Sequence, residues 1–409
     1  MRRTIRKACT GTKNILVIAA AVSAVCGHSS GYTQAAEIQV PQTGGGLESA
    51  ESGADSCGWQ KADGAQYYIS PDTGELQTGW QEIEGGQYYF SPETGKLQTG
   101  WQEIEGDRYY FEPETGRLQT GWQEIDGKKY YFSKKTGQMQ TGRQKIGGKK
   151  AYYFNDSGVL KTSGWIRDGK KVYYAKTDGV LCSGWKKADG RQYYFSPENS
   201  RMQTGWQKID GKYYFFTVSE EEKGVLKKNC IAGTKKSGYY YVGKDGVRAD
   251  SFEVNAAVQY VRSHTKAGWT ASRKLEACYQ SLRNDYTYRH YHGVPTGAEL
   301  SGCAYSLFDS GMGNCYRYAS GMACIAAVLG YPVRVATGKV TSVYGGFAEH
   351  GWAQVWDEGK WKLCDVGMKQ FMTQRHPVRS YVASAVYRLT IKNGKTAWVQ
   401  QADENSTAA

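Results

Sequence analysis

The chain has 409 residues and a formal net charge of +13, with 13% aromatic residues, 51 glycines and 32 tyrosines. An aromatic-rich chain of this kind buries enough apolar surface to fold, which excludes an intrinsically disordered protein. Glycine and tyrosine at this density favour turns and strands over a helical bundle. The one long apolar run, Ile15 to Cys26, is too short to cross a bilayer, which takes ~20 residues. A polytopic membrane protein is therefore excluded as well.

The beginning of the chain predicts export. Five basic residues precede the apolar stretch Ile15–Val25, and small residues follow up to Ala36. This order is typical of a secretory signal peptide over residues 1–36, and a short uncleaved membrane anchor is the alternative. Cleavage would remove five cations and no acid, leaving a charge of +8 that suits an anionic cell surface. Basic residues are scattered among acidic ones, so we expect no nucleic-acid partner, and no transmembrane segment after signal cleavage.

After a linker over residues 37–57, a sequence repeat occupies residues 58–245. The segments GWQEIEGGQYYFSPETGKLQT and GWQEIEGDRYYFEPETGRLQT show its form, and the first four tryptophans lie 21 residues apart. This short period predicts a solenoid whose single units cannot bury a core alone. Each unit predicts a β-hairpin with a Gly-Trp-Gln strand, an Asp/Glu-Gly turn and a Tyr-Tyr-Phe strand. The tryptophans are Trp59, Trp80, Trp101, Trp122, Trp165, Trp185 and Trp206, and Arg143 takes the place of one.

These repeats resemble the cell-wall-binding repeats of Gram-positive surface proteins, which include choline-binding modules, glucan-binding repeats and the C-terminal repeats of large clostridial toxins. The resemblance implies that the seven tryptophans bind a cell-wall polymer or another carbohydrate. Choline-binding repeats carry a third aromatic before the Tyr-Tyr pair, which completes a cage for the quaternary ammonium group. Here that place holds Gln66, Gln87, Arg108, Lys129 and Gln192, which favours carbohydrate over choline. Alternatively, the aromatic residues only hold the hairpins together.

The composition changes after Gly246, where helices are expected from Ser251 and over Thr270–Asn284, followed by a polar loop over 292–313. A further helix begins at Cys315 and has small or apolar residues on nearly all faces, which predicts burial. The free backbone N–H groups at its start stabilise a thiolate, and also an oxyanion formed by attack on a carbonyl. Cys315 is therefore a candidate nucleophile.

Two further residues could complete a catalytic site with Cys315. His350 lies in an alternating, half-buried strand, and a turn at Glu358–Gly359 leads into a second strand that contains Asp365. A two-residue turn places Asp365 on the same sheet face as His350, one diagonal step away. There the carboxylate can hold the imidazole tautomer while the other ring nitrogen faces the thiol. We predict Cys315 as nucleophile, His350 as base and Asp365 as the residue that orients His350.

This order of Cys, His and Asp resembles the transglutaminase-like superfamily of papain-like cysteine enzymes. The helix exit Leu329–Arg334 and the dipeptide Lys360-Trp361 carry the same resemblance. It implies an α+β catalytic domain over residues 246–400, before a tail over 401–409. In such enzymes an upstream side chain often completes the oxyanion hole, for which Tyr286 and Tyr288 are candidates. Cys303, placed in the predicted loop, could mask the nucleophile by forming a disulfide with it.

The whole sequence thus predicts a multidomain protein, in which an all-β hairpin solenoid precedes a C-terminal α+β transglutaminase-like (papain-like) domain. We expect an exported, cell-surface enzyme that acts on a protein or peptide substrate through a cysteine thioester. It would be a peptidase or deamidase, which we favour, or a crosslinking transglutaminase. The alternatives are a non-catalytic glycan-binding adhesin and a wall-remodelling enzyme acting on peptidoglycan stem peptides. The irregular cysteine spacing predicts no metal site, and no cofactor is implied.

Overall fold

The computed structural model describes residues 57–148, 150–291 and 293–402. The predicted signal peptide, nearly all of the linker and most of the tail lie outside these residues. The chain divides into two compact units, one formed by Met1–Gly164 with Ala175–Leu181, the other by Trp165–Tyr174 with Cys182–Ala409. In the described part of both units, no helix has the length and apolar character needed to cross a membrane.

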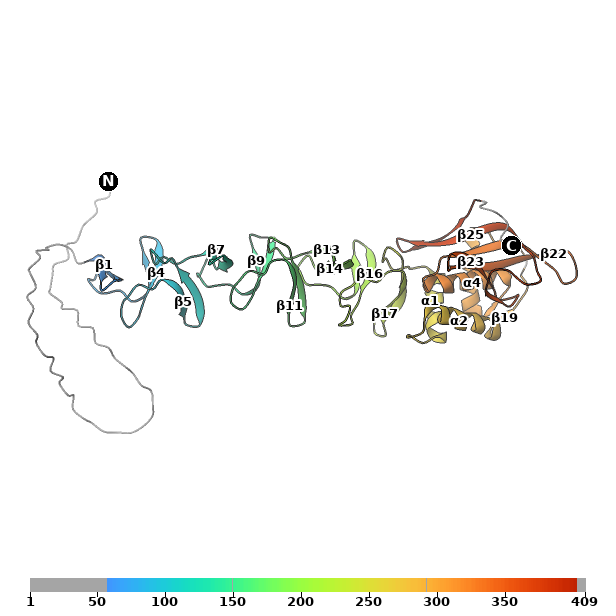
Figure 1. Cartoon of the computed structure of the whole chain (residues 1–409), viewed down its shortest axis with the longest axis horizontal. Coiled ribbons are helices and arrows are strands. Elements are labelled where there is room, and N and C mark those ends of the chain that lie inside the picture. Colours follow the sequence, from blue (N-terminus) through green and yellow to red (C-terminus); the bar gives the residue numbers. More distant parts are fainter. Residues whose placement is uncertain (1–56, 149, 292, 403–409) are drawn as a thin grey trace, which may run out of the picture. The chain divides into compact units, whose positions relative to one another are not determined.

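The first unit is built from antiparallel β-hairpins, as its repeats predict (Figure 1). Their turns place Glu84 and Gly85 at φ values of 50° and 71°, the backbone that matches the twist of a tight hairpin. The strands are β1 (Gly58–Ala62), β2 (Ala65–Ile69), β3 (Gly79–Ile83), β4 (Gly86–Phe90), β5 (Gly100–Ile104), β6 (Asp107–Phe111), β7 (Gly121–Ile125), β8 (Lys128–Phe132), β9 (Gly142–Ile146) and β10 (Lys150–Phe154). The division between the units runs through the hairpin of β11 (Gly164–Asp168) and β12 (Lys171–Ala175).

Aromatic rings connect each hairpin to the next one in the first unit. The Trp80 ring centroid lies 5.2 Å from Tyr89 of its own hairpin and 5.0 Å from Tyr109 of the following hairpin. The fully buried Phe111 contacts Trp80 from the same neighbour, at 5.7 Å. Tyr88, next to Tyr89 in sequence, instead meets Trp59 of the preceding hairpin, because adjacent residues of a strand point to opposite faces. Each such ring pair contributes about 0.5–1.5 kcal/mol beyond the burial of its surface.

The second unit continues with hairpins and then carries the α+β domain. Its complete hairpins pair β13 (Gly184–Ala188) with β14 (Arg191–Phe195), β15 (Gly205–Ile209) with β16 (Lys212–Phe216), and β17 (Cys230–Thr234) with β18 (Gly238–Val242). The last of these packs against the helical core, because the Arg262 guanidinium lies 3.1 Å from the Tyr239 ring centroid. Tyr241 is buried in that core and donates to Asn229 Oδ1 at 2.7 Å. The last hairpin is therefore part of the packing of the α+β domain.

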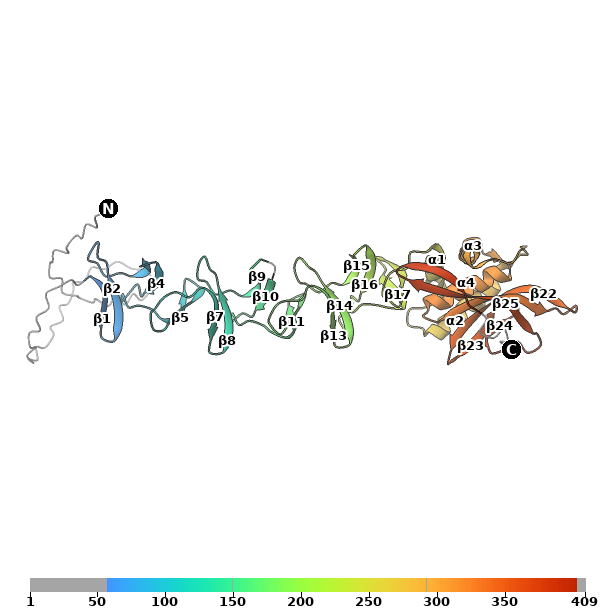
Figure 2. The same cartoon turned by 90° about the horizontal axis from the view of Figure 1, so that it is seen from above.

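A six-stranded antiparallel sheet with helices on one face forms the α+β domain (Figures 1 and 2). Its strands lie in the order β24, β23, β22, β21, β25, β26. Helix α4 packs against the central strands and is buried along most of its length. The helices are α1 (Phe252–His264), α2 (Ala271–Asp285), a 3-10 turn (Gly297–Glu299), α3 (Leu300–Ser310) and α4 (Cys315–Val328). The strands are β21 (Val333–Thr341), β22 (Phe347–Asp357), β23 (Lys360–Asp365), β24 (Gln370–Thr373), β25 (Tyr381–Lys392) and β26 (Lys395–Gln400), beside a short pair of β19 (Thr287–Tyr288) and β20 (Met312–Gly313).

The fold class is confirmed, but the predicted loop over residues 292–313 is wrong. Most of it is helical, because Leu300, Ala304 and Leu307 follow a helical spacing and are fully buried. The glycines and polar residues of this stretch suggested a loop, and tertiary burial of one apolar face overrode that local preference. Cys303 consequently lies on α3, and it and Cys315 are both free thiols with no disulfide between them in the described chain.

Candidate active site and the aromatic surface of the repeats

Cys315 is the first residue of α4, as predicted. The helix starts here because the Asn314 side chain caps it, accepting a hydrogen bond from Arg317 N at 3.1 Å. The thiol is only 7% exposed. The first turn of a helix has backbone N–H groups without intrahelical partners, and Cys315 lies in this turn.

His350 and Asp365 lie together on β22 and β23. The observed register pairs Ala353 with Cys364 and Gln354 with Leu363, which confirms the register predicted from a two-residue turn. His350 Nε2 lies 2.6 Å from Asp365 Oδ2, and both side chains are buried, at 4% and 3% exposed. The Cys315 thiol is the second hydrogen-bond partner of His350. Since Nε2 is engaged by the carboxylate, Nδ1 is the ring nitrogen left for the thiol.

The environment of His350 favours its protonated form. Burial alone lowers the pKa of His350, because it penalises a charged imidazolium ring. Hydrogen bonds to Asp365 and Cys315, with the charges of both groups, outweigh burial and raise the pKa to about 9. A ring with this pKa retains a proton taken from a thiol and can deliver it to a leaving amine.

Tyr381 on β25 completes the surroundings of Asp365 and was not found from the sequence. Its hydroxyl donates to Asp365 Oδ2 at 2.8 Å, while the backbone N–H of Met368 donates to Oδ1 at 3.1 Å. Burial and the neighbouring carboxylate raise the pKa of Tyr381, so the hydroxyl remains a donor. The only sequence signal was indirect, since a buried carboxylate needs more than one donor.

Tyr288 is the one of the two candidate oxyanion residues that contacts the nucleophile. The parallel pairing of β19 with β20 puts Tyr288 beside Gly313, two residues before Cys315. Besides burial, the thiol of Cys315 raises the pKa of the Tyr288 hydroxyl and the backbone N–H of Cys315 lowers it, so the hydroxyl lies next to both groups. The Tyr288 ring stacks on Tyr318 with centroids 6.1 Å apart. Burial first, and then Cys315, raise the pKa of Tyr288 to about 12, so the hydroxyl stays neutral.

A cavity of about 350 Å³ opens next to His350. Tyr286, Tyr288 and Tyr318 line it together with Val366 and Arg283. Among the described residues, no group of three His, Cys, Asp or Glu side chains could hold a metal ion. The cysteines Cys324 and Cys364 are core residues, and burial raises the pKa of the Cys364 thiol to about 12.

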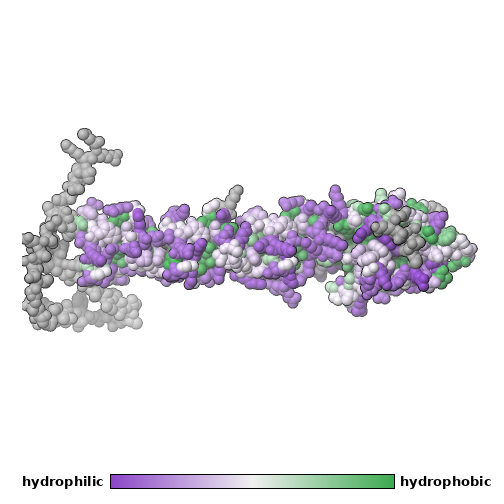
Figure 3. Space-filling model, turned by 45° about the horizontal axis from the view of Figure 1, so that its top comes forward, coloured by the Kyte–Doolittle hydropathy of each residue, from purple (hydrophilic) through white to green (hydrophobic). Residues whose placement is uncertain are grey.

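The seven tryptophans of the repeats lie on hairpin surfaces, each against aromatic rings of its own and the following hairpin. Five of them (Trp59, Trp80, Trp122, Trp165 and Trp185) are 38–40% exposed, and Trp101 and Trp206 are less exposed. The visible face along the hairpins is mostly hydrophilic, with separate hydrophobic areas (Figure 3). These tryptophans are therefore accessible aromatic groups on a polar surface.

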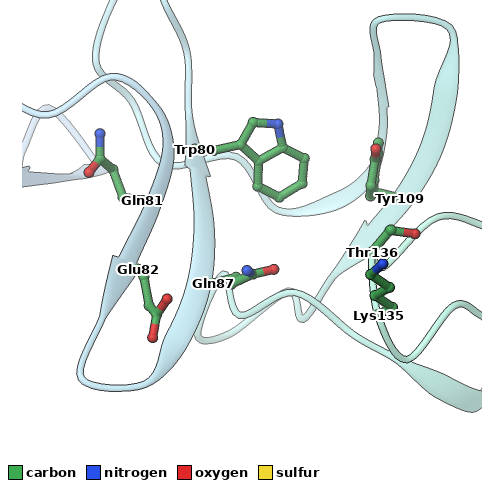
Figure 4. A pocket seen from close by; sticks show the side chains of 7 residues that line it. All are labelled: Trp80, Gln81, Glu82, Gln87, Tyr109, Lys135 and Thr136. Carbon is green, nitrogen blue, oxygen red and sulfur yellow. The ribbon is translucent and has the colours of Figure 1, made fainter.

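One cavity between hairpins shows what surrounds an accessible tryptophan. Trp80 and Gln87 project from one hairpin toward Tyr109 of the next, with Thr136 of a third nearby (Figure 4). The space has a volume of about 350 Å³. Gln87 holds the place of the third aromatic residue, so the site combines two aromatic rings with an amide group.

At the next hairpin, the chain's own cation lies against the tryptophan. Arg108 holds the place of the third aromatic residue, and its guanidinium carbon is 4.9 Å from the Trp101 ring centroid. That distance is within the range of a cation–π interaction. The Trp80 and Trp101 sites therefore differ in one polar side chain, which is Gln87 at the first site and Arg108 at the second.

Family models match both parts of the chain. The choline-binding repeat matches residues 77–120, 119–165 and 182–229, and a cell wall binding repeat matches residues 163–181. The transglutaminase-like superfamily matches residues 257–366, a range that includes Cys315, His350 and Asp365. The N-terminal part of the chain thus consists of choline-binding repeats, which precede a C-terminal transglutaminase-like domain.

Solved pneumococcal structures are similar to the repeats. CbpJ from Streptococcus pneumoniae TIGR4 is 30% identical over 45% of this chain and 62% of that chain, with a TM-score of 0.38. Choline binding protein F from Streptococcus pneumoniae, solved in the presence of a peptidoglycan analogue, is 30% identical over 45% and 61%, with a TM-score of 0.37. The choline binding domain of Spr1274 from Streptococcus pneumoniae is 30% identical over 21% and 95%, with a TM-score of 0.18.

The chain spans about three fifths of the length of the first two of these structures. No curated protein matches it significantly.

Proposed function

We propose that this protein is an exported, surface-associated cysteine enzyme that acts on amide or peptide bonds through a thioester on Cys315. The observation that carries the proposal is the buried series of contacts from Cys315 through His350 to Asp365. Burying a histidine and a carboxylate costs desolvation free energy that apolar residues of similar volume would avoid. This cost favours an enzyme over an adhesin with a silent domain.

In the proposed reaction, His350 already holds the proton of the thiol, and the Cys315 sulfur attacks the carbonyl carbon of the substrate. The backbone N–H of Cys315 and the Tyr288 hydroxyl are the groups available to donate to the oxyanion that forms. His350 then returns the proton to the departing amine, which leaves the acyl group on sulfur as a thioester. Asp365 keeps Nε2 engaged throughout, so that Nδ1 faces the sulfur.

Water is the proposed acceptor of the acyl group, which makes the protein a peptidase or deamidase. Tyr288 lines the cavity beside His350 and Tyr291 contacts Arg317 of the first turn of α4, and they are 44% and 41% exposed, so solvent reaches the mouth of the site although Cys315 itself is buried. A crosslinking enzyme has to exclude water from this position if an amine is to compete. The exposure of the two tyrosines supports hydrolysis over transfer.

For the repeats, we propose a cell-wall polymer or another glycan as the ligand. The rings of Trp80 and Tyr109 offer apolar faces for sugar rings, and the Gln87 amide can exchange hydrogen bonds with hydroxyl groups. A quaternary ammonium group would find no third aromatic residue there. At Trp101 it would compete with the guanidinium of Arg108. These two sites support glycan over choline, and the repeats would then hold the enzyme near wall-bound substrates.

The test is a comparison of the protein lacking residues 1–36 with its Cys315→Ala variant. Both are incubated with a mixed library of amide-bearing peptides and a tagged primary amine, and the products are read by mass spectrometry. Hydrolysis that depends on Cys315 is the expected result, and tagged adducts would instead identify a transferase. The matched control is Cys303→Ala, which removes a half-buried thiol on α3 and should retain wild-type activity.

A second readout follows the nucleophile itself. A mild thiol electrophile should label Cys315 in the wild type, and His350→Ala should lose most of this labelling. If wild type and variant both leave all peptides unchanged, under reducing and under oxidising conditions, this would contradict the proposed enzymatic activity. The glycan-binding adhesin would then be the better description.

A further inference from the structure

A second cavity, of about 490 Å³, adjoins the candidate active site. Gly367, Met368 and Lys369 line both this cavity and the one beside His350, so one short segment forms their shared wall. The wall is anchored to the site, because Met368 N donates to Asp365 Oδ1 at 3.1 Å. A substrate bound at Cys315 could therefore extend across this wall into the second cavity.

Positive charge lines both cavities. Arg283 and Lys369 lie in the wall of the first, and Lys369 and Arg379 lie in the wall of the second, beside the His376 ring. None of the described residues lining either cavity is an aspartate or a glutamate. Carboxylates that normally neutralise surface cations are thus missing from these walls.

The cations are also free to bind a ligand. No ion pair within the described residues involves Arg283, Lys369 or Arg379. Arg379 Nη1 donates to the Thr341 carbonyl oxygen at 2.6 Å, which fixes the guanidinium in the cavity wall with its other N–H groups available. His376 Nδ1 accepts from Arg379 N at 3.0 Å, which leaves Nε2 as the donor of this ring. A fixed guanidinium is well suited to a carboxylate, because little conformational entropy is lost on binding.

We propose that the second cavity binds a carboxylate of the acyl donor, so that the substrate is an acidic peptide. An extended peptide advances ~3.3–3.6 Å per residue, and the cavities share a wall three residues long. The carboxylate would therefore lie one to three residues from the amide that Cys315 attacks. Lys369 and Arg379 contact it. This inference rests on the proposed function, because it names the substrate class of the same site.

Binding is measured first, in the Cys315→Ala variant of the protein without residues 1–36, so that no turnover is needed. Two sets of fluorescein-labelled peptides differ only by Asp or Asn at one to three positions from a glutamine, and their affinities are compared by fluorescence anisotropy. The Asp peptides should bind ~10-fold more tightly at low salt and lose most of this preference in 0.5 M NaCl. Equal binding, tighter binding of the Asn peptides or undetectable binding of all Asp peptides would overturn the proposal.

Two charge variants show whether the second cavity is responsible. Lys369→Gln, made in the Cys315→Ala protein, should reduce the Asp-to-Asn preference ~3-fold, while Lys266→Gln between α1 and α2 removes the same charge elsewhere and should preserve it. A preference unchanged in Lys369→Gln and in Arg379→Gln would overturn the assignment.

Turnover of the same peptides by the wild type is a separate measurement, with its own outcome. Absence of turnover together with a clear Asp preference in binding contradicts the proposed enzyme and leaves the anion site standing. Turnover of Asp and Asn peptides at equal kcat/KM contradicts the acidic substrate and leaves the enzyme standing.

Discussion

The hairpin repeats and the α+β domain build their sites from residues at very different distances along the chain. At Trp80, the partners Tyr109 and Thr136 come from the next hairpins, so each aromatic site is local and recurs with the repeat. In the α+β domain, the nucleophile lies on α4 and its partners on β22, β23 and β25. Loss of one hairpin therefore removes one of several similar sites, whereas loss of one strand removes the whole candidate active site.

The largest effect should come from Asp365→Asn. The amide has no negative charge to stabilise the protonated form of His350, and the rate should fall on the order of 10²–10⁴-fold. The measurement is peptide hydrolysis at neutral pH, with binding to immobilised cell walls as the control for the repeats. A rate within a few-fold of wild type would show that His350 does not need its carboxylate.

The same variant should change how stability depends on pH. The pKa of His350 is raised from 6.5 to about 9, so its stabilising contribution is complete below pH ~6.5 and is lost as the pH rises through 9. This contribution is at most about 3 kcal/mol. Urea unfolding of wild type and Asp365→Asn at pH 6, 7.5 and 9.5 should give a difference that shrinks with increasing pH. A constant difference would contradict the raised pKa.

An added methyl group should destabilise the protein more in the sheet than in a loop of the same domain. A Cβ at Gly338 would lie 2.1 Å from the Val382 carbonyl oxygen on β25, at a bulge between the two strands. Gly338→Ala should therefore lower the free energy of unfolding by about 1–3 kcal/mol or more. Gly268→Ala is the matched control, since a Cβ there meets nothing within 4 Å. Equal thermal stability of the two variants would contradict this close strand contact.

The last hairpin, formed by β17 and β18, should contribute to the stability of the α+β domain. A chain that begins at residue 246 lacks Tyr239 and Tyr241 and exposes the surface that they cover on α1. It should be less stable by about 2–4 kcal/mol than a chain that begins at residue 229. Thermal unfolding of the two fragments decides this, and equal midpoints would show that β17 and β18 belong with the repeats.

The smallest effect is expected from Trp80→Ala. Several tryptophans remain to bind the wall, so retention on cell walls should fall only about two- to threefold, with peptide hydrolysis unchanged. The local hairpin contacts with Tyr109 and Phe111 are lost, which hydrogen exchange of that hairpin would detect. Complete loss of retention would mean that the Trp80 site alone carries the affinity.

Features with local sequence signals could be predicted. The hairpins repeat every ~21 residues, Cys315 follows an Asn cap, and the β22–β23 register follows from a two-residue turn. Helix α3 was missed because its glycine and polar residues concealed a short apolar face. Tyr381 had no local signal, since β25 reaches the sheet by pairing with β21, about 40 residues earlier in the chain.

Asp365 accepts hydrogen bonds from three groups, which are the His350 ring, the Tyr381 hydroxyl and the backbone N–H of Met368. The bonds from His350 and Tyr381 exist only after the central strands have paired. The nucleophile and its base are thus assembled in the same step that completes the sheet. If the chain is exported unfolded, as proposed, its bond-breaking chemistry would become available only after it has folded on the far side of the membrane.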